Sequence, residues 1–245
     1  MALYAWRVAL CFVAASAAAA PMQPDQTLAQ GTNGPQPLTK TNKEIRCDRL
    51  DSSAHERRVS AADEMVCLTQ LGDIASRRGD QLLLKLTNGK TKMLASGSKA
   101  CADHNVEKCI VYRLAGFFPA HQMILVYVAV YEGTPWFLLV SRRTGDQVKL
   151  LGEPHFSPSG GRVVSMAWDE SGESESGLDI WSIKANRPAL EWRNRQEAVE
   201  FDRWLNDERL AVKMFYGKGH AEVVHANGNW ELLISKSKGP PERRE

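Results

Sequence analysis

The sequence lacks the motifs that mark several common enzyme classes. It has no GxSxG nucleophile elbow, no HExxH zinc pair, no Walker loop and no glycine-rich dinucleotide fingerprint. It also lacks an excess of charge, because 31 lysines and arginines face 29 aspartates and glutamates and leave a formal charge of +2. So small a charge favours neither nucleic acid nor acidic lipid over other partners. We therefore expect no nucleic-acid binding. The absence of these motifs favours a protein that is not an enzyme, and we single out no catalytic residue.

Long apolar runs are absent after residue 20. Residues 1–20 hold one cation, Arg7, and then an uncharged apolar run that ends in small residues, which is typical of a secretory signal peptide. A signal anchor is the alternative, although the run is short for a membrane span. No later stretch reaches the roughly 18 apolar residues of a membrane helix. We expect an exported protein, periplasmic or secreted, with no integral membrane span once the signal is removed.

Cysteine is scarce, and its placement is informative. Cys11 lies in the signal, so an even number remains for the exported chain, which predicts two disulfides in an oxidising compartment. Three connectivities are open, and the sequential one closes the shortest loops. His104 lies inside the second of these loops, but the paired spacing of a zinc site is missing. Disulfides are therefore expected at Cys47, Cys67, Cys101 and Cys109.

Two segments are too poor in apolar residues to offset the entropy of ordering. These are residues 21–42 and 236–245, which we predict to be a disordered leader and a disordered tail. Between them, residues 43–100 form a disulfide-bearing N-terminal cap or first β unit. Ser60 and Asp63 have capping-box spacing, and Met65, Leu68 and Leu71 recur at helical intervals. This pattern predicts a short helix near 61–70, with a strand as the alternative.

After residue 80 the pattern is that of a β meander. Short apolar runs alternate with turn residues, and Asn88-Gly89 and Asn227-Gly228 favour tight hairpins. Residues 123–130 carry no charge on either face, which predicts protein on both sides of that strand. The predicted strands are residues 81–86, 91–96, 109–118, 123–131, 136–142, 147–151, 162–168, 178–183, 188–192, 209–216, 221–226 and 229–235.

A repeat runs through the second half of this meander, residues 101–235. Phe118, Phe156 and Trp204 each precede a turn and a long apolar strand, at intervals of 38 and 48 residues. We take these aromatic residues as the starts of three units. Propeller blades repeat at about 40–50 residues.

The best-preserved unit supports a family resemblance. HFSPSGGRV at 155–163 and LDIWSI at 178–183 resemble the turn-strand repeats of TolB-like and WD40-like β-propeller proteins of the bacterial exported type. Ser159 replaces the usual aspartate, and no GH…WD pair is present. The resemblance implies an all-β, mainly antiparallel fold with three propeller-like units, and residues 43–100 as a cap or fourth unit.

Two candidate sites stand out. Acidic side chains crowd residues 169–179 and offer oxygens for calcium, but the regular order of a calcium loop is missing. A solvated loop is therefore the favoured interpretation, and a calcium site is the alternative. A tryptophan next to two arginines, in the run Trp192-Arg193-Asn194-Arg195, is the best candidate for an exposed binding residue. The acidic candidates are Asp169, Glu170, Glu173, Glu175 and Asp179, and the binding candidates are Trp192, Arg193 and Arg195.

These patterns favour an exported, non-enzymatic binding or scaffold module that engages an envelope or extracellular protein or peptide. One alternative is a periplasmic hydrolase with its site on loops. Another is a structural protein stabilised by calcium. Apart from calcium in this alternative, we expect no cofactor.

Overall fold

The computed structural model describes residues 44–47, 59–131, 133–169, 175–215 and 219–234. All of them belong to one unit of the chain, residues 38–245. The predicted signal peptide, the leader up to residue 42 and the predicted tail lie outside the described residues. Within the described ranges, no helix has both the length and the apolar character needed to cross a membrane.

Antiparallel strands dominate the fold and form four sheets, none of which closes into a barrel. This confirms a mainly antiparallel β protein. The helices are short: α1 Ala61–Gln70, α2 Ser98–Ala102, η2 Val106–Lys108 and η3 Pro119–His121. The strands are β1 Ile45–Arg46, β2 Ala75–Arg78, β3 Gln81–Lys85, β4 Thr91–Ala95, β5 Ile110–Phe118, β6 Met123–Val130, β7 Trp136–Ser141, β8 Gln147–Leu150, β9 His155–Phe156, β10 Arg162–Ala167, β11 Gly177–Lys184, β12 Arg187–Asn194, β13 Val199–Asn206, β14 Arg209–Met214, β15 His220–Ala226 and β16 Asn229–Ile234.

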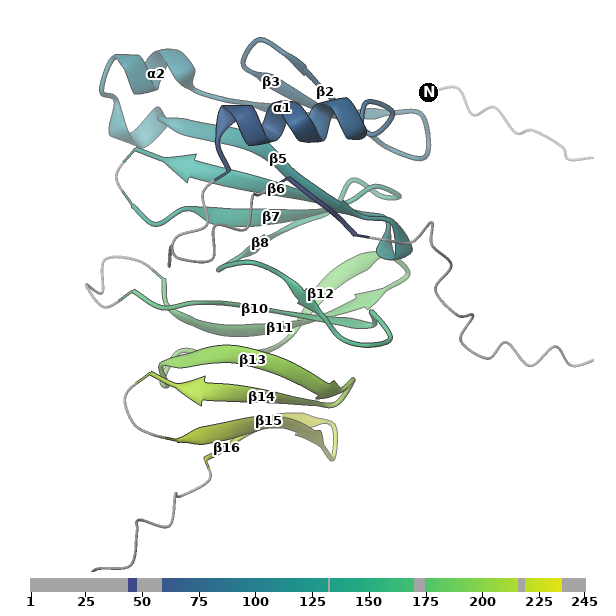
Figure 1. The fold of residues 1–245 in the computed structure, drawn as a ribbon, viewed down its shortest axis with the longest axis vertical. Coiled ribbons are helices and arrows are strands. Elements are labelled where there is room, and N and C mark those ends of the chain that lie inside the picture. Colours follow the sequence, from purple (N-terminus) through teal and green to yellow (C-terminus); the bar gives the residue numbers. More distant parts are fainter. Residues whose placement is uncertain (1–43, 48–58, 132, 170–174, 216–218, 235–245) are drawn as a thin grey trace, which may run out of the picture. The chain divides into compact units, whose positions relative to one another are not determined.

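Three successive four-stranded meanders make up most of the chain (Figure 1). They are β5–β8, which β1 extends at the β5 edge, then β9–β12 and β13–β16. Each unit begins one strand earlier than the sequence predicts, because Phe118 and Phe156 end first strands and Trp204 lies within one. The first strands of the second and third units, β9 and β13, were not predicted, for a physical reason. β9 has two residues, and β13 mixes charged and apolar side chains, so neither shows a long apolar run.

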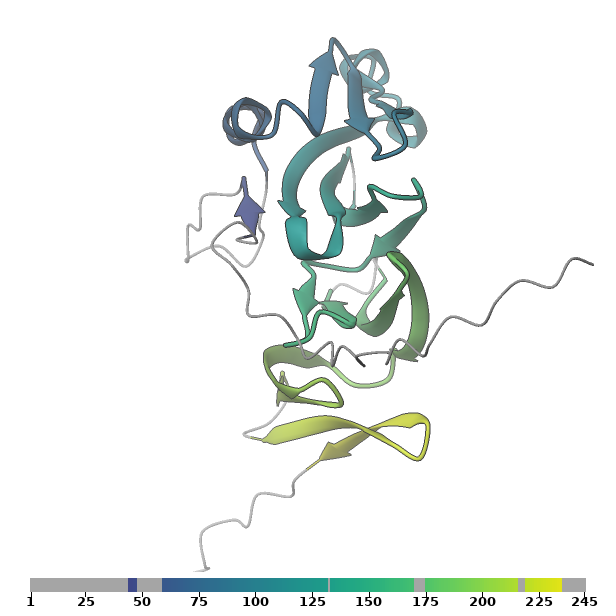
Figure 2. The same ribbon diagram turned by 90° about the vertical axis from the view of Figure 1, so that its right-hand side faces the viewer.

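Successive sheets are stacked one after another (Figure 2). They pack face to face through three apolar cores. Strand β6 shows the principle: Ile124 and Val126 point into the core shared with α1 and β2–β4, whereas Leu125 and Tyr127 point into the core shared with β10 and β11. This confirms the prediction that protein covers both faces of residues 123–130. The third core lies between β10–β12 and β13–β16.

The outer face of the last sheet is polar. Arg209 and Lys213 alternate along β14 with residues of the third core and form ion pairs with Glu222 and Asp202. A terminal unit needs such a face, and no other sheet of the described residues covers it.

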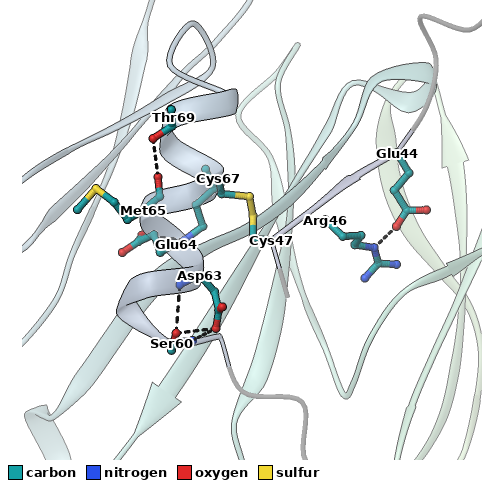
Figure 3. Close-up of a disulfide and its surroundings, with 10 residues drawn as sticks. Glu44, Arg46, Cys47, Ser60, Asp63, Glu64, Met65, Cys67 and Thr69 are labelled. Atoms are coloured by element: carbon teal, nitrogen blue, oxygen red, sulfur yellow. Dashed lines mark hydrogen bonds and ion pairs between the residues drawn. A yellow bond between two sulfur atoms is a disulfide. The ribbon is translucent and has the colours of Figure 1, made fainter. Parts of the chain in front are cut away.

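The N-terminal region contains the predicted helix and a disulfide that joins this helix to the residue after β1 (Figure 3). Helix α1 starts at the predicted capping box, in which the Ser60 side chain accepts from the Asp63 N–H at 3.1 Å. The disulfides are sequential, Cys47–Cys67 and Cys101–Cys109, so these cysteines do not form the alternative metal site.

Helix α1 is attached to the edge of β5 by a buried carboxylate. Glu64 Oε1 accepts from the Leu114 N–H at 2.9 Å, and it also accepts from Arg77 Nη2 at 2.6 Å. The pairing of β5 with β6 shifts register between Leu114 and Gly116. The carboxylate therefore satisfies a strand-edge N–H that would otherwise be buried without a partner.

Equivalent turns of neighbouring units contact one another. The His121 ring, between β5 and β6, stacks on Phe156 with ring centroids 4.5 Å apart. It also lies against Gly160, where φ is +72° and a Cβ atom would come within 1.7 Å of the ring. The next contact joins Asp207 to the turn after β9: its Oδ1 accepts from the Ser159 N–H at 3.0 Å and from Ser159 Oγ at 2.7 Å.

Candidate functional site

The structure joins two candidate sites that the sequence keeps apart. Strand β12 pairs with β11 so that Arg193 lies opposite Asp179. Arg193 Nε and Nη2 donate to the two Asp179 oxygens at 3.1 Å each, and Arg195 Nη1 lies 2.8 Å from Asp179 Oδ1. The Asp179 side chain is only 1% exposed, so this carboxylate is committed to the two arginines.

A second carboxylate extends the cluster. Glu175 accepts from Arg195 Nη2 at 3.2 Å and from Lys149 Nζ at 3.3 Å. Burial alone would raise the pKa of Glu175, but these hydrogen bonds outweigh it and hold the pKa below its ordinary value. The hydrogen bond to Asp179 likewise raises the pKa of Arg193. The acidic candidates Glu175 and Asp179 therefore fix the arginine candidates in place.

The remaining acidic candidates divide in two. Asp169 is described, and its backbone N–H donates to Ser176 Oγ at 2.8 Å. Glu170 and Glu173 lie outside the described residues. Among the described residues, no group of three or more metal-binding side chains converges.

Trp192 points to the other side of β12 and packs against the third core. It borders a cavity of about 690 Å³ between the last strands of two sheets, β12 and β16. We call this cavity the outer pocket. Its lining includes all three binding candidates and side chains of β16, namely Trp192, Arg193, Arg195, Trp230, Leu232 and Ile234.

The floor of the outer pocket is held firmly. Trp230 is 5% exposed, and its Nε1–H donates to Glu191 at 3.2 Å. Arg162 donates to the same carboxylate at 2.8 Å and lies over the Trp230 ring. Burial raises the pKa of Glu191, but the hydrogen bonds from Arg162 and Trp230 bring it below the ordinary value. A ligand would therefore meet a preformed aromatic wall.

A second cavity, of about 380 Å³, lies beside the first strands β9 and β13. Its His155 ring stacks on Phe201 at 4.2 Å, and the His155 carbonyl accepts from Trp204 Nε1 at 2.9 Å. Its charged groups pair among themselves, as Arg203 does with Asp202 at 2.8 Å. The outer pocket is the larger of these two cavities and is lined by all three binding candidates, so we regard it as the stronger candidate.

Sequence reasoning missed half of the outer pocket. Trp230, Leu232 and Ile234 lie 38 to 42 residues after Trp192 in the sequence, and only the packing of two sheets brings them together. No local pattern in the sequence marks that contact.

No family model, curated protein or solved structure matches this chain.

Proposed function

We propose that this chain is an exported, non-enzymatic binding module with propeller-like units. It binds an extended peptide segment of a partner protein, which adds as a strand to the outer edge of β16, an edge that no described strand covers. The observation that carries the proposal is the position of this edge beside the outer pocket. Strand addition supplies affinity through main-chain hydrogen bonds, and pockets for alternate side chains supply specificity.

The propeller-like assignment is supported by the repeat of four-stranded meanders. Blades of propellers are four-stranded sheets, and here three such meanders follow one another in the chain. Export is supported by the two disulfides, which form and persist in oxidising compartments.

Strand β16 has the features of an edge that can pair. It has six residues, pairs with β15 without a register shift and contains no proline. Leu233 and Ile234 are each 50% exposed. An apolar, regular edge readily accepts another strand.

The other edges of the last two sheets are less suited to pairing. β13 is interrupted by two register shifts, β12 contains Pro188 and one shift, and β9 has only two residues. Bulges, proline and short length are the features by which proteins protect sheet edges.

The outer pocket accounts for selectivity. Trp192, Trp230 and Leu232 offer an apolar wall, and its volume of about 690 Å³ lies within the range of ligand sites. We expect alternate apolar side chains of the bound strand to enter it. Arg193 and Arg195 stiffen the rim, because Asp179 and Glu175 hold them.

The test is to select peptides from a displayed random library on the folded protein and to measure their affinity by fluorescence anisotropy. We expect selected peptides to carry apolar residues at alternate positions. N-methylation of alternate backbone amides should weaken binding at least about tenfold, because each methyl removes a strand hydrogen bond.

Two neighbouring substitutions provide a matched pair. Ile234→Lys places a charge in the outer pocket, whereas Leu233→Lys makes the same change at a residue of equal exposure that does not line it. We expect a loss of at least about tenfold for Ile234→Lys and less than about threefold for Leu233→Lys. Equal losses, or tolerance of N-methylation at every position, would exclude this binding mode.

A further inference from the structure

Cations are concentrated in three turns of the chain. The residues are 85–92 between β3 and β4, 142–146 between β7 and β8, and 184–187 between β11 and β12. Asp146 is the one carboxylate within these segments. We leave Lys184 aside, because it interacts with Glu191. The remaining cations form what we call the basic turn face: Lys85, Lys90, Lys92, Arg142, Arg143 and Arg187.

Direct contacts join the three turns into one surface. The Thr87 N–H donates to the Arg142 carbonyl at 2.9 Å, and Lys92 Nζ donates to the Gly145 carbonyl at 2.8 Å. Arg187 Nε lies 3.2 Å from Asp146, which links the third turn to the second. The three turns, with the cations they carry, therefore lie next to one another although they come from three different sheets.

Most of these cations are held by neutral groups. Lys85 Nζ donates to the Gly72 carbonyl at 3.3 Å, and Arg142 Nε donates to the Lys85 carbonyl at 3.1 Å. Arg143 Nε lies 3.3 Å from the Asn186 amide oxygen when that amide is oriented to donate to the His121 carbonyl. Carbonyl and amide oxygens satisfy a cation's hydrogen bonds without cancelling its charge. The positive potential of the face therefore persists, with Asp146 and the nearby Asp73 as the opposing carboxylates.

We propose that the basic turn face binds the anionic headgroups of a lipid bilayer. The cations are spread over turns of three sheets, so they match a two-dimensional array of anions better than a single ion or one extended chain. The three turns contain no aromatic side chain on which the bases of a single-stranded nucleic acid would stack. Each lysine or arginine near an anionic leaflet strengthens binding by about fivefold.

The experiment is co-sedimentation of the folded protein with vesicles. One set contains phosphatidylcholine alone, and the other also contains phosphatidylglycerol at about three lipids in ten. We expect binding to the anionic set only, and weaker binding when the salt concentration is raised.

A matched pair of double variants separates the basic turn face from net charge. Lys90→Gln with Arg143→Gln removes two exposed cations from the face. Lys99→Gln with Lys108→Gln removes two exposed cations from α2 and η2. These helices come before the start of β5, whereas the turn of His121 comes after its end. The first pair should lower partitioning about 25-fold and the second by less than about threefold.

Three results would overturn the proposal: equal binding to both vesicle sets, equal losses in the two variants, or binding to soluble polyglutamate but not to anionic vesicles. Thermal melting of each variant checks that it is folded. Salt dependence of the wild-type protein gives a second measurement that needs no variant. Peptide binding at β16 is measured separately, so either proposal can fail without the other.

Discussion

At the scale of single residues, His121 joins two of the three units. It stacks on Phe156 and leaves no room for a side chain at Gly160. Burial lowers the pKa of His121 below 6.5, because the charged imidazolium loses its hydration there. The contact between the first two units is therefore sensitive to acid.

The sign of the pH dependence follows from this lowered pKa. The unfolded chain binds the proton more readily than the folded one, so the full contribution is present above pH 6.5. We expect stability to fall as the pH drops below 6.5 towards the folded pKa. Urea unfolding between about pH 7.5 and 5 measures this loss, and His121→Phe should reduce its slope. His121→Gln cannot protonate either, so an unchanged slope in both variants would contradict the assignment.

At the scale of elements, Glu64 attaches helix α1 to the β sheet. Glu64→Ala leaves the Leu114 N–H without its acceptor and Arg77 without its carboxylate. We expect a loss of about 3 kcal/mol in the free energy of unfolding, and about 1 kcal/mol for Glu64→Gln, which keeps a hydrogen-bond acceptor. Urea titration gives both values. Similar small losses in the two variants would show that this carboxylate does not hold the helix.

The elements that could be predicted from sequence are those with a local signal. The capping box predicts the helix at residues 61–70, and apolar runs predict strands such as β6 and β11. The sequence does not predict β13, because Glu200, Asp202 and Arg203 interrupt its apolar residues. Its place in the sheet depends on pairing with β14, a contact that periodicity along one strand does not contain.

The candidate site shows the same limit. Trp192, Arg193 and Arg195 stood out in the sequence, as did the acidic residues, but their pairing depends on the register of β11 with β12. Net charge concealed the basic turn face in a similar way. A total of +2 says nothing about which turns lie together, and hydrogen bonds and an ion pair join three turns that carry the cations.

At the scale of the whole molecule, the two disulfides constrain different regions. Cys47–Cys67 joins cysteines 20 residues apart and connects β1, which pairs with the edge of β5, to helix α1. Cys101–Cys109 joins cysteines only 8 residues apart in the sequence. Replacing Cys47 and Cys67 by alanine should cost about 3 kcal/mol, and replacing the other pair about 2.5 kcal/mol.

Hydrogen exchange distinguishes the two disulfide variants more sharply than stability does. Without Cys47–Cys67, amides of β1 and the neighbouring edge of β5 should exchange faster. Without Cys101–Cys109, faster exchange should stay within about residues 98–110, the segment of α2 and η2. The same exchange pattern in both variants would contradict separate roles.

The contacts between equivalent turns constrain how such a chain can change its number of units. His121 fits a glycine of the next unit, whereas the serine turn of that unit fits Asp207 of the one after. The two joints use different chemistry, so the units are not interchangeable copies. If the middle unit were deleted, the imidazole of His121 would face the turn that carries the Asp207 carboxylate instead of a turn with a glycine. A gene duplication or loss would therefore have to be accompanied by substitutions at both joints, which favours a fixed number of units.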